Sequence, residues 1–210
     1  MTNASEPAAS PFAIFGVLAP IFDEGRYLTF LNLSHQPEDD VAVLKTIVQA
    51  AAPSLEADIM TMLAPTEGWR PQVVGASAAI ALGSVSAPVI EALWAALDQP
   101  SWAAPQLVAA AFLLDPDFDA RARSRIEGLC FTDPIDQRRE YPDSPVRSGP
   151  NSKQLAAMIA LARRREDSAW LDAFVARPGT QAVLANDRGE GGRIADAWLN
   201  RAKRLLSPSA

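Results

Sequence analysis

Apolar positions recur every three or four residues along most of the chain, which is the spacing of one face of an α-helix. Two clear stripes are Val89 or Ile90 with Leu93 and Leu97, and Phe118 with Ala122, Ile126 and Leu129. No run of strict alternation, the pattern of a half-buried strand, follows residue 37. The pattern therefore predicts an all-α protein.

Prolines and acidic residues mark where these helices are expected to begin. A proline has no N–H to contribute, and at the first helical position that N–H would have no partner anyway. The prolines that fit this place are Pro37, Pro71, Pro88 and Pro105. Glu38, Asp39 and Asp40 follow directly after Pro37, where acidic side chains meet the positive end of the helix dipole.

Part of the helical pattern is repeated. The segment PQVVGASAAIAL at residues 71–82 returns 34 positions later as PQLVAAAFLLDP at residues 105–116. The next helix repeats with the same step, since LEADIMTML at 55–63 precedes VIEALWAAL at 89–97 by 34 positions. A further copy, QLAAMIALA from Gln154, follows after one step plus 14 inserted residues. A stack of helical hairpins is predicted, because one hairpin cannot bury its own apolar face.

The repeat divides most of the chain into units of two helices each. The four units are 37–64, 69–99, 101–130 and 152–176, and a last helix at 194–206 is expected to close the stack. Paired helices with a proline in the first helix and an Ala, Leu and Val body resemble HEAT-type repeats over residues 37–176. The resemblance implies a right-handed α-α superhelix. The Asp and Arg that often mark HEAT loops are not regular here, so the resemblance assigns no site residues.

One compact domain is predicted, made of residues 37–206 with an insertion at 131–151 and preceded by an N-terminal tail and apolar cap at 1–36. The apolar run FAIFGVLAPIF at 12–22 is too short to span a bilayer. We expect it to be buried against the first unit. The alternative is an exposed segment that docks on a partner or a membrane. For residues 12–33, helices are favoured over a hairpin.

Composition excludes several kinds of site. With 210 residues the chain can bury about 70% of its unfolded surface in one body. A single cysteine, Cys130, cannot form an intramolecular disulfide or a multi-cysteine zinc site, and we expect it to be a buried thiol. The single histidine, His35, cannot build a histidine-rich metal site. Neither a Walker phosphate loop nor a Gly-x-Ser-x-Gly elbow is present. We expect no cofactor.

Glycines near the end of the chain do not form a dinucleotide fingerprint. Gly189, Gly191 and Gly192 lie in DRGEGGR, and no strand precedes them. This segment is interpreted as a hinge before the last helix. Residues 1–11 carry no basic residue, so no secretory signal is predicted and the protein is expected to be cytoplasmic.

Charge is unevenly distributed. The chain has a net charge of −6, and residues 1–68 hold nine acidic and two basic residues. A general nucleic-acid binder needs a cationic footprint, so nucleic acid is not an expected partner. Basic runs at 121–125 and 163–165 have acidic residues nearby, which is typical of a solvated helix face.

Candidate interaction residues lie on the outward face of the second helices and in the insertion. The helical-repeat resemblance places second helices on the concave, binding side. The candidates there are Glu56, Met60, Glu91, Trp94, Asp98, Arg121, Arg125 and Trp170, and those in the insertion are Arg138, Arg139 and Tyr141. Trp and Arg are common interface anchors, although Trp94 could instead pack against a neighbouring unit.

Three functions fit these observations. The first is a non-catalytic module that binds another protein, for example an immunity or antitoxin protein whose acidic half meets a basic patch on its target. The second is a DNA-base-removing glycosylase, because some HEAT-like folds do this chemistry; Trp94, Trp170, Asp172 and Arg125 would take those roles. The third is a structural subunit of a larger complex. The sequence leaves the oligomeric state open.

Overall fold

The computed structural model describes residues 10–33, 37–51, 54–99, 101–128, 150–165 and 169–206. Throughout these residues the regular structure is helical and no strand occurs, which confirms the all-α prediction. In chain order the helices are η1 (Ala13–Leu18), α1 (Pro20–Asp23), α2 (Tyr27–Asn32), α3 (Pro37–Ala50), α4 (Leu55–Leu63), α5 (Trp69–Leu82), α6 (Ala87–Leu97), α7 (Ala104–Leu114), α8 (Phe118–Gly128), α10 (Pro150–Ala162), α11 (Ala169–Val175), α12 (Pro178–Asp187) and α13 (Glu190–Leu206).

Helix starts fall close to the prolines named above. Helix α3 begins at Pro37, but α6 and α7 begin one residue before Pro88 and Pro105, and α5 begins two residues before Pro71. These shifts are tolerated because the first four N–H groups of a helix have no intrahelical partner. Proline therefore fits anywhere in the first turn, and in α5 this leaves room for Trp69 and Arg70 ahead of it.

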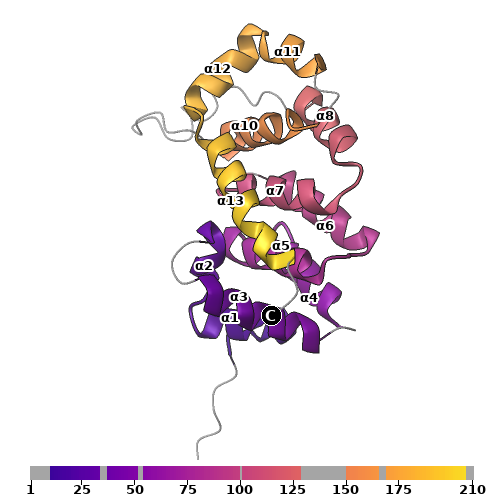
Figure 1. Cartoon of the computed structure of the whole chain (residues 1–210), viewed down its shortest axis with the longest axis vertical. Helices are drawn as coiled ribbons and strands as arrows, with labels where there is room; N and C mark the ends of the chain where they lie inside the picture. Colours follow the sequence, from indigo (N-terminus) through magenta and orange to yellow (C-terminus); the bar gives the residue numbers. More distant parts are fainter. Residues whose placement is uncertain are drawn as a thin grey trace, which may run out of the picture.

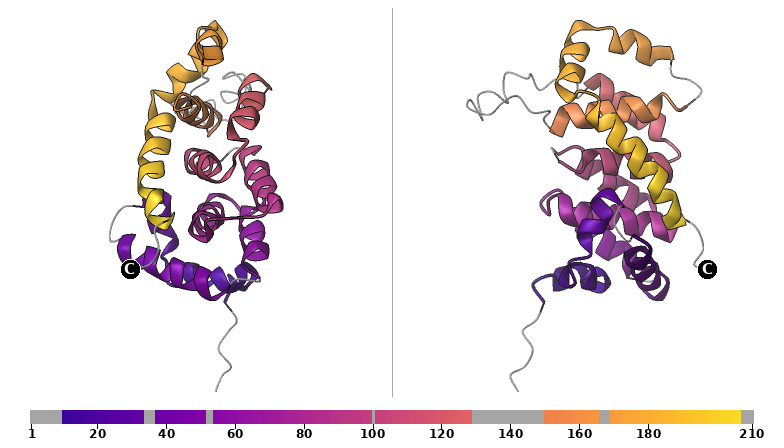
Figure 2. Two further views of the ribbon diagram at one scale, coloured as in Figure 1. Left: turned by 45° about the vertical axis from the view of Figure 1, so that its right-hand side comes forward. Right: turned by 60° about the vertical axis from the view of Figure 1, so that its left-hand side comes forward.

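The helices form three layers (Figures 1 and 2). Helices α5, α7 and α10 lie side by side as a central layer, with α4, α6 and α8 on one side of it and α13 on the other. The central layer is covered on both sides, so residues 71–80 of α5 and 104–111 of α7 are all buried, and most of them are apolar. Gly75 of α5 is packed so closely that an added Cβ would lie 2.9 Å from the Cβ of Met62.

Buried glutamines tie the central layer to its neighbours. Gln72, Gln106 and Gln154 lie within the first five residues of α5, α7 and α10 and are 2%, 3% and 6% exposed. The Gln106 amide donates to the carbonyl of Leu31 at 2.9 Å and that of Gln154 to the carbonyl of Leu97 at 2.6 Å. The Gln72 side-chain oxygen accepts from Ser101 at 3.2 Å. The repeated Gln thus occupies corresponding positions in three adjacent helices.

Helix α13 differs from the expected closing helix in two ways. It begins at Glu190, four residues earlier than predicted, and it runs across α10, α7 and α5 instead of closing one end of the stack (Figure 2). Gly191 and Gly192 are helical, so the hinge interpretation is wrong for them. A Cβ at Gly191 would overlap the backbone of Lys153, which means that the missing side chain allows α13 to approach α10. The turn itself is at Arg188 and Gly189, with φ of 55° and 74°.

The apolar run at 12–22 forms η1 and α1, and α2 follows. Phe15, Leu18, Ile21 and Phe22 are buried, and η1 packs against α4. Residues 178–187, for which the sequence predicted no helix, form α12.

Candidate protein-interaction site

The sequence predicted that Trp94 lies on the outward face of its helix, and the structure shows that it is buried instead. Its side chain is only 1% exposed, its indole N–H donates to Asp115 Oδ2 at 2.6 Å, and its ring centroid lies 5.9 Å from that of Phe118. The reason is that α6 is buried along two stripes, and Trp94 continues the one formed by Ile90 and Leu97. Packing against a neighbouring unit, the alternative for this residue, is what the structure shows.

The charged candidates around Trp94 pair with one another between α6 and α8. Arg125 forms hydrogen bonds of 2.7 and 3.0 Å to the Asp98 carboxylate, and its guanidinium lies 4.4 Å from the Trp94 ring centroid. Arg121 contacts Glu91 at 2.6 Å and Asp115 at 3.3 Å. The hydrogen bond from Arg121 lowers the pKa of Glu91. These residues therefore join α6 and α8 by ion pairs within the chain, so each charge already has an opposite charge beside it.

The remaining candidates are separate from this group. Glu56 accepts a 2.8 Å hydrogen bond from the backbone N–H of Ser86, which precedes α6. Met60 is half-buried against the core. Trp170 is half-buried with the Arg123 guanidinium 5.0 Å from its ring centroid. Outside the described residues lie Arg138, Arg139, Tyr141, Cys130 and His35.

An open aromatic cleft of about 480 Å³ lies between the N-terminal cap and the start of α5. Its walls come from η1, α1 and α2 on one side and from residues 67–71 on the other. The lining residues are Pro11, Phe12, Ile14, Phe15, Phe22, Tyr27, Glu67, Gly68, Trp69, Arg70 and Pro71. A volume in this range is typical of ligand pockets.

Phe22 is the centre of the cleft's aromatic cluster. Its ring centroid lies 5.3 Å from Phe12, 4.9 Å from Phe15 and 5.6 Å from Tyr27, and the Tyr27 and Phe22 rings are nearly parallel. Phe15 and Phe22 are buried, whereas Phe12 and Tyr27 are half-buried and Ile14 is 61% exposed. The cluster therefore gives the cleft an apolar floor with two partly exposed aromatic rings, Phe12 and Tyr27, at its edge.

A contact with α4 holds η1 in place beneath the cleft. Asp58 Oδ2 accepts a 3.0 Å hydrogen bond from the backbone N–H of Val17. Gly16 has φ of 55° and ψ of −128°, a conformation that essentially only glycine adopts, and a Cβ there would overlap the Asp58 carboxylate. The break in η1 at Gly16 thus depends on the absence of a side chain.

The rim opposite Tyr27 is positioned by the start of α5. Gly68 precedes the helix with φ of 77°, and Trp69 and Arg70 are the first two helical residues. The Arg70 guanidinium lies 4.6 Å from the Trp69 ring centroid and 5.9 Å from that of Tyr27. Arg70 is exposed, and no carboxylate of the described residues pairs with it. A cation is thus held between two aromatic rings and remains open to a ligand.

The rim also offers polar groups that the fold does not use. The indole N–H groups of Trp94 and Trp198 donate to Asp115 and to the carbonyl of Phe30, at 2.6 and 2.9 Å. Within the described residues, neither the indole N–H of Trp69 nor the hydroxyl of Tyr27 has a protein partner, and both side chains are only half-buried. The Glu67 carboxylate also has no partner among them. The cleft therefore combines aromatic faces with hydrogen-bond donors and both signs of charge.

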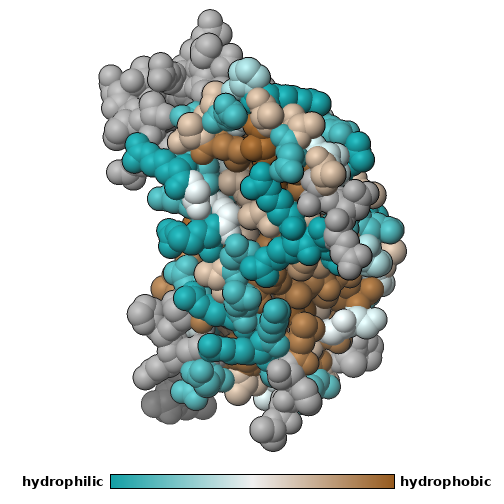
Figure 3. All heavy atoms as spheres, turned by 45° about the horizontal axis from the view of Figure 1, so that its top comes forward, coloured by the Kyte–Doolittle hydropathy of each residue, from teal (hydrophilic) through white to brown (hydrophobic). Residues whose placement is uncertain are grey.

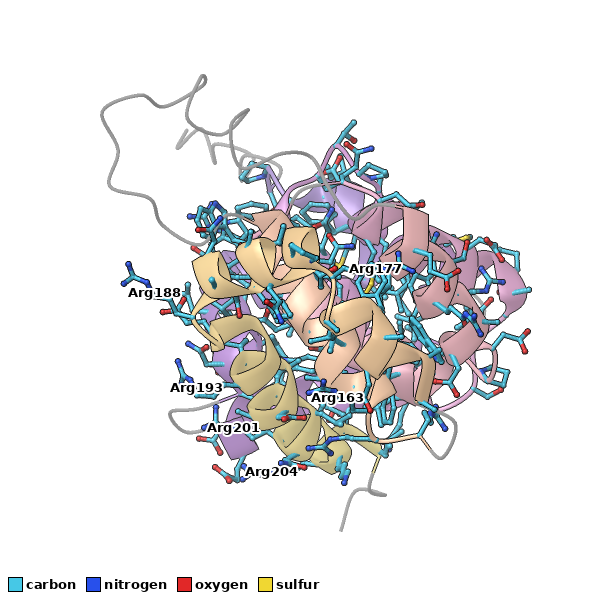
Figure 4. All side chains as sticks on the ribbon, turned by 90° about the horizontal axis from the view of Figure 1, so that it is seen from above. Arg163, Arg177, Arg188, Arg193, Arg201 and Arg204 are labelled. Atoms are coloured by element: carbon cyan, nitrogen blue, oxygen red, sulfur yellow. The ribbon has the colours of Figure 1, made fainter. Side chains whose placement is uncertain are left out.

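A second surface carries arginines near α12 and α13. Figure 4 labels Arg163, Arg177, Arg188, Arg193, Arg201 and Arg204 in this region. Most of them have contacts within the chain: Arg163 with Asp172 at 3.5 Å, Arg204 with Glu38 at 3.4 Å, Arg201 with the carbonyl of Asn32 at 2.7 Å, and Arg177 with the Phe174 ring at 5.0 Å. In the part of the chain that the structure describes, Arg188 and Arg193 are the labelled arginines without such a contact. Figure 3 shows the surface from a direction between those of Figures 1 and 4, with hydrophilic areas beside hydrophobic ones on the face that it presents.

Searches for a metal site or a membrane span among the described residues, and for proteins similar to the chain, gave no positive result. No group of His, Cys, Asp and Glu among the described residues could hold a metal ion. No helix within them has the length and apolarity needed to cross a membrane. No family model, curated protein or solved structure shows a significant match to this chain.

Sequence reasoning missed the cleft, although signals for it were present. The dipeptide Trp69-Arg70 directly precedes Pro71, so both side chains lie in the first turn of a helix, where nothing of the same helix covers them. The run at 12–22 holds three phenylalanines, and it was expected to be a buried cap, with an exposed docking segment as the alternative. Neither signal shows from sequence alone that these segments meet.

Proposed function

We propose that the protein is a non-catalytic binding module that holds a segment of another protein in the aromatic cleft. The observation that supports this is the Arg70 guanidinium between Trp69 and Tyr27 at the rim of an open, phenylalanine-lined cleft. Aromatic residues and arginine are the residue types most enriched in interface hot spots. The site differs from the face originally expected, where the tryptophan is buried and the arginines are paired.

We further propose that the scaffold is a HEAT-like α-α superhelix of about four helical hairpins. The support is the stacking of α5, α7 and α10 with a buried glutamine near the start of each. The proposal keeps the cytoplasmic location expected from the sequence. Such scaffolds place partners on surfaces built by several units. Here α13 covers one side of the central layer, and the aromatic cleft lies between the N-terminal cap and the start of α5.

An immunity or antitoxin role is the narrower form of this proposal. It is supported by the acidic first part of the chain, with nine acidic and two basic residues over 1–68, which includes one wall of the cleft. Glu38 and Asp39 are exposed there. A basic target would associate faster at low salt, because the attraction of exposed charges is screened by ions.

No observation favours base removal from DNA. Of the four residues considered for it, Trp94 and Arg125 contact each other, while Trp170 contacts Arg123 and Asp172 contacts Arg163. The arginines near α12 and α13 leave few free cations among the described residues, whereas strongly salt-dependent DNA binders contact about 6–10 phosphates. DNA binding, like assembly as a subunit, is kept as an outcome of the test.

The test is capture of partners from the native cells with tagged wild-type protein and two variants. Trp69→Ala removes a cleft wall, and Trp102→Ala removes a tryptophan that is 54% exposed at the start of α7. We expect one stoichiometric protein that is lost with Trp69→Ala and retained with Trp102→Ala. A partner retained by both variants would overturn the cleft as the binding site, and recovery of nucleic acid would overturn the function.

A further inference from the structure

The geometry points to one class of occupant for the aromatic cleft: an extended, proline-containing segment in the polyproline II conformation, with an acidic residue that meets Arg70. This inference rests on the proposed function and names the chemistry of the partner at the same site. It is argued from the aromatic faces, the free hydrogen-bond donors and the charge of the rim.

The aromatic faces of the cleft suit proline rings. Phe12, Tyr27 and Trp69 are half-buried and line the opening, so part of each ring remains exposed. The Arg70 guanidinium covers part of the Trp69 and Tyr27 rings, and Tyr27 also stacks on Phe22 at 5.6 Å, so proline rings would contact the remaining exposed parts. Polyproline II has three residues per turn and a rise of about 3.1 Å, so apolar rings project from it at regular short intervals. Grooves lined by aromatic side chains are the known mode of binding such segments, whose stiffness lowers the entropy lost on binding.

The unused donors suit the backbone of such a segment. Polyproline II has no internal hydrogen bonds, so its carbonyl groups are free to accept. The indole N–H of Trp69 and the hydroxyl of Tyr27 have no protein partner in the described chain and stand on either side of Arg70. Side chains of this type present an apolar body with a polar tip, which allows stacking and hydrogen bonding to the same ligand.

The charge of Arg70 determines which residue type is favoured at one end of the bound segment. Its guanidinium is held by two aromatic rings, which restrict its position without neutralising it. A carboxylate is the complementary group, and arginine can bind it with two parallel hydrogen bonds. Glu67 lies on the same wall and disfavours a second carboxylate beside it. An acidic residue at one end of the segment is therefore favoured over an acidic stretch.

Other modes of peptide binding fit less well. Addition of a strand needs a sheet edge, and the described residues contain no strand. A helix with its side chains is about 10–12 Å wide and rises about 5.4 Å per turn, so a cleft of this volume holds roughly one turn. Helix-in-groove binding uses anchors over two turns or more. The narrower polyproline II segment is the conformation that the cleft accommodates best.

The experiment is a titration of isotope-labelled, full-length protein with three synthetic ten-residue peptides, followed by the tryptophan indole N–H signals in NMR spectra. The first peptide is APPAPPAPEA; the second replaces every proline with alanine, and the third replaces the glutamate with lysine. The Trp69 signal is identified with Trp69→Phe, and Trp102 provides the internal control. We expect saturable shifts of the Trp69 signal with the first peptide, none with the alanine peptide, and weaker binding of the lysine peptide. Arg70→Glu should reverse the preference between glutamate and lysine.

Two outcomes would overturn the inference. One is an equal response to the alanine peptide, and the other is no response of Trp69 to the first peptide up to millimolar concentration. Neither outcome affects the capture experiment, in which a native partner lost with Trp69→Ala still supports the binding module. In that case the bound segment has another conformation.

Discussion

At the scale of single residues, the environment of each tryptophan separates structural from accessible positions. Trp94 and Trp198 are both 1% exposed, with their indole N–H groups bonded to the protein. Trp69 and Trp102 are accessible, and Trp69 shares its cleft with Arg70. Residue type and exposure alone therefore do not single out a candidate interface anchor, and Trp69 differs from Trp102 in that it lines a cleft.

Trp94→Ala should destabilise the protein by about 3–5 kcal/mol, because it empties a large buried site and leaves Asp115 without one of its hydrogen-bond donors. Urea unfolding followed by circular dichroism would measure the change. Trp102→Ala, the exposed control, should cost at most about 1 kcal/mol, because it loses only the contact of its ring with Lys153. An unchanged midpoint for Trp94→Ala would contradict the burial described above.

Gly191→Ala should also be destabilising, by about 1–3 kcal/mol or more, because its Cβ would overlap the backbone of Lys153 and force α13 away from α10. Gly179→Ala is the matched control, since it is also helical and nothing lies within 4 Å of its added Cβ. That control should be neutral or stabilising by about 0.4–1 kcal/mol. Equal effects in thermal unfolding would show that the close approach of α13 is wrong.

At the scale of elements, the junction between α12 and α13 depends on a buried carboxylate. Asp187 is fully buried and accepts from the backbone N–H of Gly191 at 3.1 and 2.9 Å. Burial raises its pKa, and this effect is opposed by the hydrogen bond from Gly191 and by the charge of Lys153. The folded protein thus holds a proton on Asp187 more readily than the unfolded chain does.

Asp187 should therefore make the free energy of unfolding depend on pH. Its contribution is fully present below the unfolded pKa of about 3.9 and is lost as pH rises through the raised folded pKa. Asp187→Asn cannot ionise, so the stability of the variant relative to wild type should increase as pH rises above about 4. Urea titrations of both proteins at several pH values would measure this. A difference that is flat or falls with pH would contradict the raised pKa.

The sequence predicted the helices well where local signals act alone. The bounds of α4 were predicted at 55–63, as found, and α8 matches its apolar stripe to within a residue. The sequence-based prediction failed where contacts between helices determine whether a segment is helical. Gly191 and Gly192 were interpreted as a hinge, because the neighbouring sequence gives no sign that backbone carbonyls of α10 lie against them. Likewise, α12 has no clear apolar stripe and was missed despite Pro178 at its start.

At the scale of the whole molecule, the three layers should set the order of local stability. Helices α5 and α7 are buried on both sides, whereas α11 contacts few other elements and carries several exposed residues. Amide hydrogens of α5 and α7 should exchange only through global unfolding, and those of α11 through local opening. Native-state hydrogen exchange would measure this. Faster exchange in α7 than in α11 would contradict the layer arrangement.

The candidate site could not be derived from the sequence, because its two walls are separated by about forty residues and no local pattern links them. Phe22 and Trp69 share a cleft only because α2 and η1 pack against the helices that follow them. The predicted face, in contrast, was read from helical spacing as the positions that fall off the apolar stripes. Helix α6 is also in contact with α7, which buries the second stripe that includes Trp94.

The most direct test of the account is photo-crosslinking from the cleft in the native cells. A benzophenone amino acid at position 14 would replace Ile14, which is 61% exposed on the cleft lining, and the matched probe would replace Trp102, which is 54% exposed elsewhere. The account predicts one discrete crosslinked protein from position 14 and none from position 102. It also predicts that Arg70→Glu abolishes the product. No product from position 14, or the same product from both positions, would contradict the cleft as the binding site.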